Sequence, residues 1–132
     1  DAAVFRGDDG LDEVTVSTTT RVWWVRDGQV RSRTVDPTRL GLGLHPTEDL
    51  RGGDAVHNAH VVRDIFAGAT GAVRDAVLLN AGIALALTQP DSGGDQESFD
   101  RDLRTGMDRA AAAIDSGEAT RTVDRWIRAT RS

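Results

Sequence analysis

The densest group of side chains that could do chemistry is a run of four carboxylates within six residues: Asp8, Asp9, Asp12 and Glu13. The run follows a short apolar segment, residues 2–5, which is typical of a buried strand. In open α/β sheets, ligands bind beyond the carboxyl ends of the strands. Gly7 and Gly10 would let the backbone turn sharply and approach a ligand closely. The position of the run therefore favours a ligand site.

The adjacent pair Asp12 and Glu13 is the candidate set of metal ligands. Proteins hold Mg²⁺ with one or two carboxylates, while water and substrate phosphates complete its shell. The pair could serve only if the backbone bends there, because adjacent side chains in a regular strand point to opposite faces. The alternative is a solvated acidic turn, since acidic residues are common in turns. The spacing alone leaves both interpretations open.

A second possible metal set lies in the first predicted helix. His57, His60 and Asp64 recur at i, i+3 and i+7 and so share one helical face, as a zinc site would require. The opposite face carries the apolar stripe, so we expect these three side chains to form a solvent-exposed, metal-free face. His45 precedes Pro46 in a loop and has no sequence neighbour that would tune it.

The composition excludes several kinds of chemistry. The 132 residues carry a net charge of −5 and no Cys, which rules out disulfide scaffolds, thiol catalysis and Cys-ligated metals. All 16 cationic residues are Arg, so a catalytic lysine is excluded, and Ser116 lacks the nearby His that a nucleophile needs. The acidic balance argues against nucleic-acid binding, and no apolar run is long enough to span a membrane. The length fits one domain, and the absence of an initiator Met leads us to expect that the natural chain starts further upstream.

The first third of the chain has the pattern of short strands. Residues 13–16, 21–25 and 30–35 are predicted strands, and Asp27-Gly28 supplies the positive φ angles of a tight hairpin turn. Trp23 and Trp24 are adjacent in a strand, so we expect one ring to face the core and the other to face outward. The strand at residues 2–5 has no parallel partner in this chain, and its open edge indicates a piece of a larger α/β domain.

The remainder is predicted to form four helices. Ala55–Phe66 ends at Gly68, Ala72–Leu87 is apolar on nearly all sides, and a third helix covers residues 99–114. The fourth is predicted to start at a capping box formed by Asp115 and Glu118. Its buried stripe would consist of Val123, Trp126 and Ile127.

Asn80 is a polar residue inside the predicted buried helix Ala72–Leu87. A buried amide needs hydrogen-bond partners, so we expect it to bond to loop backbone. Contact with a substrate is the alternative role.

Five motifs, in order along essentially the whole chain, resemble those of anthranilate phosphoribosyltransferases. They are residues 3–13, the Asp27-Gly28 hairpin with the turn at 36–42, Arg51-Gly52-Gly53-Asp54 with Asn58-Ala59, residues 71–81, and residues 114–119. Each motif is modest alone, and their shared order makes the resemblance specific. One departure is Arg6, where many relatives carry His.

The resemblance implies an α/β fold. It corresponds to the C-terminal part of a phosphoribosyltransferase/nucleoside phosphorylase-type α/β domain, with a mixed sheet that contains an antiparallel hairpin and is flanked by helices. Residues 1–132 would be the C-terminal part of the catalytic domain, while the N-terminal helical domain and the phosphate loop would lie upstream. We therefore expect these residues alone to be inactive.

The resemblance also implies an activity, namely transfer of phosphoribose from 5-phosphoribosyl-1-pyrophosphate to anthranilate, with release of pyrophosphate, in tryptophan biosynthesis. In that family the pair matching Asp12 and Glu13 holds Mg²⁺ at the pyrophosphate. No catalytic or substrate-binding residue is carried over to this chain. The family further implies a cytoplasmic homodimer formed through the N-terminal helical domain, without nucleic-acid or membrane partners.

Two alternatives to this function stay open. One is a non-catalytic relative on the same scaffold that binds nucleic acid, and the acidic balance argues against it. The other is a related nucleoside phosphorylase, which lacks the Gly-Leu-Asp-Glu segment in this setting. The residues upstream of Asp1 would distinguish them through the presence or absence of the phosphate loop.

Overall fold

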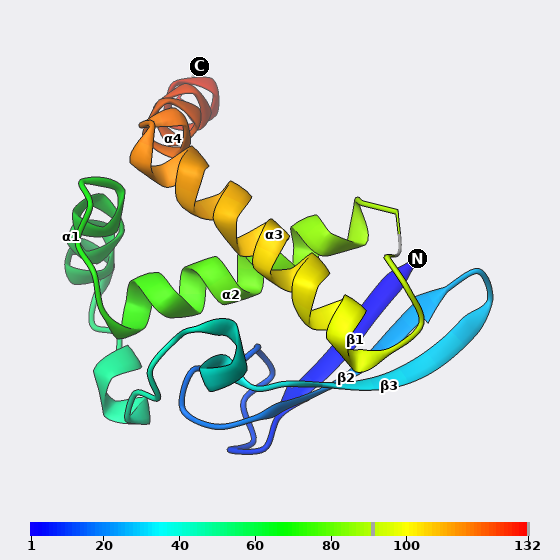
Figure 1. The fold of residues 1–132 in the computed structure, drawn as a ribbon. Coiled ribbons are helices and arrows are strands. Elements are labelled where there is room, and N and C mark those ends of the chain that lie inside the picture. Colours follow the sequence, from blue (N-terminus) through cyan, green and yellow to red (C-terminus); the bar gives the residue numbers. More distant parts are fainter. Residues whose placement is uncertain (91, 132) are drawn as a thin grey trace.

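The computed structural model describes residues 1–90 and 92–131 and contains strands followed by helices (Figure 1). The strands and the short 3₁₀ turns are β1 (Ala2–Gly7), β2 (Thr20–Arg26), β3 (Gln29–Val35), η1 (Pro37–Leu40) and η2 (Thr47–Leu50). The helices are α1 (Ala55–Phe66), α2 (Ala72–Leu87), α3 (Gln96–Asp115) and α4 (Glu118–Thr130). The predicted α/β class is confirmed. No helix within the described ranges is long and apolar enough to cross a membrane.

The three strands form one sheet in the order β1-β2-β3, and both strand pairs are antiparallel. The predicted hairpin turn joins β2 to β3, with positive φ at Asp27 (50°) and Gly28 (71°), the backbone that an Asp-Gly turn provides. Trp24 is 4% exposed and faces the core, whereas Trp23 is 39% exposed. The expected split of the two tryptophan rings is therefore confirmed.

Two strand predictions are wrong in part. Residues 2–5 do lie in the sheet, but β1 is an edge strand with Val4 58% exposed, because the helices cover only one face of the sheet (Figure 1). Residues 13–16 are buried at Val14, Thr15 and Val16 but do not form a strand. Their backbone groups bond to side chains instead of to a neighbouring strand, as in the 3.0 Å bond from the Thr15 N–H to the hydroxyl of Thr20.

Helices α2 and α3 cross beside the sheet (Figure 1), and small residues allow them to approach closely. A Cβ atom on Gly106 would collide with the Gly82 carbonyl, and one on Gly82 would lie 2.6 Å from the Cγ of Met107. Leu79 and Ile83 of α2 are 0% and 2% exposed. The expectation that this helix forms the buried centre of the helical layer is confirmed.

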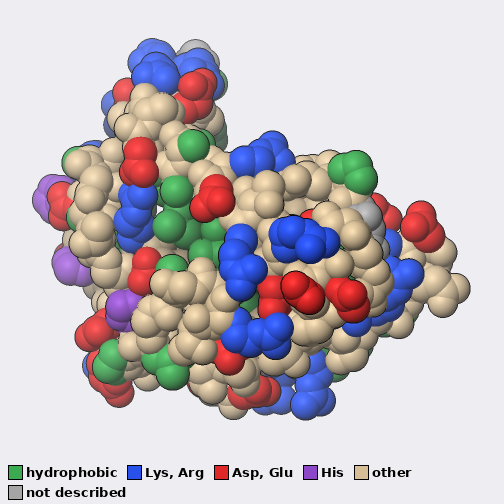
Figure 2. Space-filling view, viewed as in Figure 1, with side chains coloured by type: hydrophobic (Ala, Val, Ile, Leu, Met, Phe, Trp, Pro, Cys, Tyr) green, Lys and Arg blue, Asp and Glu red, His purple; other side chains and the backbone are tan. Residues whose placement is uncertain are grey.

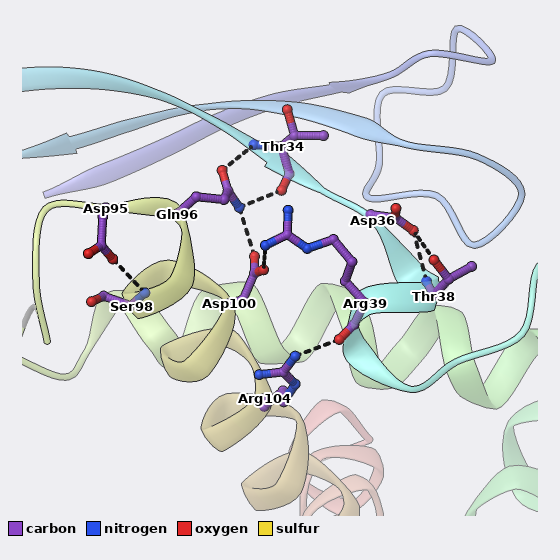
Figure 3. A network of polar contacts seen from close by, with 9 residues as sticks. All are labelled: Thr34, Asp36, Thr38, Arg39, Asp95, Gln96, Ser98, Asp100 and Arg104. Atoms are coloured by element: carbon purple, nitrogen blue, oxygen red, sulfur yellow. Dashed lines mark hydrogen bonds and ion pairs between the residues drawn. The ribbon is translucent and has the colours of Figure 1, made fainter.

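The start of α3 is fastened to the sheet by polar side chains (Figure 3). The helix begins at Gln96, not at residue 99, because the Asp95 carboxylate accepts a 2.8 Å hydrogen bond from the Ser98 N–H. The Gln96 amide bonds to both the N–H (3.1 Å) and the carbonyl (2.8 Å) of Thr34 in β3. It also donates to Asp100, which is 4% exposed and forms an ion pair with Arg39.

Two expectations about α4 are wrong. The helix starts after Gly117, whose φ of 75° is left-handed, and no side chain caps it. Asp115 belongs to the end of α3, where its carboxylate forms a 2.8 Å ion pair with Arg74 of α2.

The predicted stripe of α4 is not buried either. Trp126 is 67% exposed because α4 projects from the end of α3, away from the sheet (Figure 1). Val123 and Ile127 are half-buried and line one wall of a groove of about 510 Å³, and α1 forms the other wall. Hydrophobic side chains reach the surface between these helical segments (Figure 2).

Candidate functional site

The acidic run lies in the loop between β1 and β2, where the backbone turns back on itself. The Gly7 N–H donates to the Leu11 carbonyl and the Gly10 N–H donates to the Gly7 carbonyl, each at 2.9 Å. Gly10 has a φ of 94°, which strains any residue other than glycine. The Asp8 N–H closes the loop with a 2.9 Å bond to the Thr19 carbonyl. The sequence therefore forms a tight turn at the end of β1, as its two glycines predicted.

Two of the four carboxylates are occupied by the loop itself. Asp8 accepts a hydrogen bond from the hydroxyl of Thr19. Asp9 accepts one from the Leu11 N–H at 3.1 Å and one from the Thr15 hydroxyl at 2.6 Å. These bonds stabilise the turn, so Asp8 and Asp9 have structural roles.

The other two carboxylates, Asp12 and Glu13, have no such role. Both residues are exposed, and their backbone bends rather than continuing a strand. Within residues 1–90 and 92–131, neither carboxylate accepts a hydrogen bond or forms an ion pair. Their oxygens are therefore available to a cation, and the bend meets the condition that the sequence set for a metal pair.

The loop is anchored to the helical layer directly after this pair. Asn80 of α2 accepts a 3.0 Å hydrogen bond from the Val14 N–H and donates a 2.8 Å bond to the Val14 carbonyl. The side chains of Val14 and Val16 are 1% and 0% exposed and belong to the core between the sheet and α2. The expectation that Asn80 bonds to loop backbone is confirmed.

The histidines do not assemble a second site. His57, His60 and Asp64 are all exposed on α1, as predicted, and histidine side chains are visible on the outer side of that helix (Figure 2). No group of three or more His, Cys, Asp or Glu side chains is arranged to hold a metal in the described parts of the chain. A magnesium site of two carboxylates, water and phosphate does not require such a group.

The interpretation of His45 as a residue without a partner is wrong. Its Nε2 lies 2.8 Å from the Asp75 carboxylate of α2, and its N–H donates a 3.0 Å hydrogen bond to the Val16 carbonyl. Asp75 is 30 residues away in sequence, so no local pattern could reveal the contact. His45 thus joins the loop after η1 to both α2 and the acidic loop.

Comparison with known proteins supplies the family. The model described as "Glycosyl transferase family, a/b domain" matches residues 1–120. This chain belongs to that family. Among curated members, anthranilate phosphoribosyltransferase of Nocardioides sp. is 56% identical over 131 residues, which are 98% of this chain and 37% of the relative. The enzyme of the same name from Streptomyces avermitilis is 51% identical over 129 residues, covering 98% of this chain and 35% of the relative.

Solved structures of glycosyl transferase family members share the fold. Anthranilate phosphoribosyltransferase from Thermus thermophilus superimposes with a TM-score of 0.77 at 29% identity, over 99% of this chain and 36% of that one. The Saccharomyces cerevisiae enzyme in complex with PRPP and Mg gives a TM-score of 0.77 at 23% identity, over 92% of this chain and 33% of that one. The resemblance inferred from the five motifs is confirmed, and this chain spans about a third of the length of these relatives.

Proposed function

We propose that this chain is the C-terminal part of the α/β catalytic domain of an anthranilate phosphoribosyltransferase. The 56% identity to a relative of that name over 131 residues carries the proposal. The complete enzyme would transfer phosphoribose from 5-phosphoribosyl-1-pyrophosphate to anthranilate and release pyrophosphate, in tryptophan biosynthesis. It would act as a cytoplasmic homodimer, joined through an N-terminal helical domain and without nucleic acid. The 132 residues alone would be inactive, because none of them matches the family's phosphate loop.

Within this chain, we assign Asp12 and Glu13 to hold Mg²⁺ at the pyrophosphate of the donor substrate. Support comes from two exposed, adjacent carboxylates without protein partners, in a bent loop at the end of β1. A bound Mg²⁺ would offset the negative charge that develops on the departing pyrophosphate. Asp12 and Glu13 supply oxygens for the ion and transfer no proton. Asp8 and Asp9 hold the loop in shape through Thr19 and Thr15.

The test replaces both carboxylates by their amides, Asp12→Asn and Glu13→Gln, in the full natural chain. The substitutions preserve side-chain shape and remove two negative charges. We expect kcat to fall and the Mg²⁺ concentration at half-maximal rate to rise, since the oxygens that hold the ion are weakened. Anthranilate affinity, measured separately by calorimetry, should change little, because the pair is assigned to the donor side.

A matched control removes the same two charges elsewhere. Glu97 and Asp108 are exposed residues of α3, and the double replacement Glu97→Gln and Asp108→Asn should leave both kcat and the Mg²⁺ midpoint at wild-type values. A wild-type rate with an unshifted Mg²⁺ midpoint in the Asp12→Asn/Glu13→Gln protein would refute the metal assignment. Equal effects in the two double variants would attribute the change to net charge.

A further inference from the structure

Asn80 contacts the acidic loop at the residue that directly follows the proposed metal pair. Its Oδ1 accepts from the Val14 N–H at 3.0 Å, and its Nδ2 donates to the Val14 carbonyl at 2.8 Å. The two residues are 66 positions apart in sequence, so these bonds link the loop to the middle of α2. Asn80 therefore holds Val14 as a neighbouring β-strand would, although no strand is present there.

The orientation of this amide is fixed on the helix side. The second proton of Nδ2 is donated to the carbonyl of Ala76, one turn earlier in α2, at 3.0 Å. An asparagine side chain has two N–H donors and one carbonyl acceptor, and all are used here. The side chain cannot rotate about its terminal bond without losing all three bonds. Because α2 is the buried centre of the helical layer, the amide is presented from a rigid support.

These bonds set the backbone geometry beside the proposed metal pair. The Val14 N–H belongs to the planar peptide unit that joins Glu13 to Val14, so its bond to Asn80 fixes the orientation of that plane. The Val14 carbonyl belongs to the following peptide plane, which Asn80 fixes as well. The hydrogen bonds of Asp9 organise the loop on the other side of the pair but do not connect it to α2.

We propose that Asn80 is a positioning residue for the Asp12–Glu13 metal site, acting through the backbone of Val14 and without touching the ion. This inference rests on the proposed function, since it requires that the pair holds a divalent cation at a pyrophosphate. Partners that orient metal ligands commonly change metal affinity or activity by about 10-fold to 100-fold when they are removed. We therefore expect loss of the Asn80 amide to weaken cation binding by about 10-fold.

The experiment measures binding of the Mn²⁺–pyrophosphate complex to the full natural chain by water-proton relaxation, a readout that is independent of turnover. Asn80→Leu replaces the amide by an apolar side chain of similar size. Leu78→Ala is the control, because Leu78 is a buried residue of the same helix that packs against α1 and α3 and not against the loop. Urea unfolding of each variant reports its loss of stability. Asn80→Ser, which lacks the two-sided amide but stays polar, is used if Asn80→Leu does not fold.

Weaker binding by about 10-fold in the Asn80 variant, with wild-type binding in the equally or more destabilised Leu78→Ala protein, would support the inference. Wild-type binding in the Asn80 variants would overturn it, and so would losses in both variants that follow their stabilities. Asp12→Asn/Glu13→Gln is measured in the same assay. Unchanged binding in that protein would overturn the metal assignment itself, and the positioning role with it, whereas a loss confined to it would overturn the role of Asn80 alone.

Discussion

The four carboxylates of the acidic loop are adjacent in sequence but should differ sharply in their contribution to stability. Asp9 accepts a 2.6 Å bond from the Thr15 hydroxyl and a 3.1 Å bond from the Leu11 N–H, while Asp12 accepts none from the described residues. Thr15 is 1% exposed. We therefore predict that Asp9→Ala destabilises the fold and that Asp12→Ala does not.

The magnitude follows from what each truncation leaves behind. In Asp9→Ala, the Leu11 N–H is exposed and can bond to water, so its loss costs little. The Thr15 hydroxyl proton is buried and loses its acceptor, which costs about 1–3 kcal/mol for an unsatisfied buried group. Asp12→Ala removes an exposed side chain without partners, so its effect should stay within about 0.5 kcal/mol. The expected difference between the two variants is therefore about 1–2 kcal/mol.

The assay is urea unfolding followed by tryptophan fluorescence, because Trp24 is buried in the core beneath the sheet. A double-mutant cycle with Thr15→Val isolates the key bond, since valine removes the hydroxyl and keeps the shape of the side chain. In that background Asp9→Ala should cost less than about 0.5 kcal/mol. Equal free energies of unfolding for Asp9→Ala and Asp12→Ala would refute the division of the loop into structural and free carboxylates. An undiminished cost in the Thr15→Val background would refute its assignment to this bond.

Two further predictions concern the scaffold around the loop. Gly106→Ala should lower the free energy of unfolding by about 1–3 kcal/mol despite a better helix propensity, because its Cβ would collide with the Gly82 carbonyl; Thr105→Ala, at an exposed neighbouring position, should be nearly neutral in the same urea titration. Asp95→Ala should lower the urea midpoint at neutral pH, because the hydrogen bond from the Ser98 N–H stabilises the Asp95 carboxylate and holds its pKa below the usual 3.8. That contribution is present above pH 3.8 and is lost as the pH falls through the lowered pKa, so the gap between wild type and variant should narrow in acid. A gap that is constant with pH would contradict this role for the charge.

Local sequence signals predicted the elements whose ends are determined locally. The Asp27-Gly28 turn appears where the sequence places it, and α1 and α2 have the predicted bounds. Asp54 caps α1 by accepting from the His57 N–H at 2.8 Å, which is a contact within four consecutive residues. Such features need no knowledge of the rest of the chain.

The elements that sequence reasoning missed depend on distant partners. Residues 13–16 have the alternation of a strand, but Asn80 supplies the hydrogen bonds of Val14 from 66 residues away. The apolar stripe of α4 has the correct helical period, yet period does not say whether another element covers it, and Trp126 is 67% exposed. In both cases the local pattern identified an apolar segment and tertiary contacts decided its conformation or burial.

The candidate site illustrates the same limit. Sequence could identify four carboxylates beside two glycines but could not say which of them the loop would use. Asp8 and Asp9 have partners because the hydroxyls of Thr19 and Thr15 return to them across the loop. The resemblance to a known family selected Asp12 and Glu13, and the contacts within the loop give a physical reason why these two remain free for a cation.

Three amide side chains hold loops or strand edges by binding both backbone groups of one residue: Asn80 on Val14, Gln96 on Thr34 and Asn58 on Gly53. An amide carries an acceptor and two donors in one plane, so it can satisfy a residue's N–H and C=O as a neighbouring strand would. Unlike a strand, it does so without adding a backbone ladder that would impose alternation on adjacent side chains. In the acidic loop this arrangement secures the backbone at one residue and leaves the two residues before it bent and exposed, which is the condition that a pair of adjacent carboxylates must meet to bind one ion.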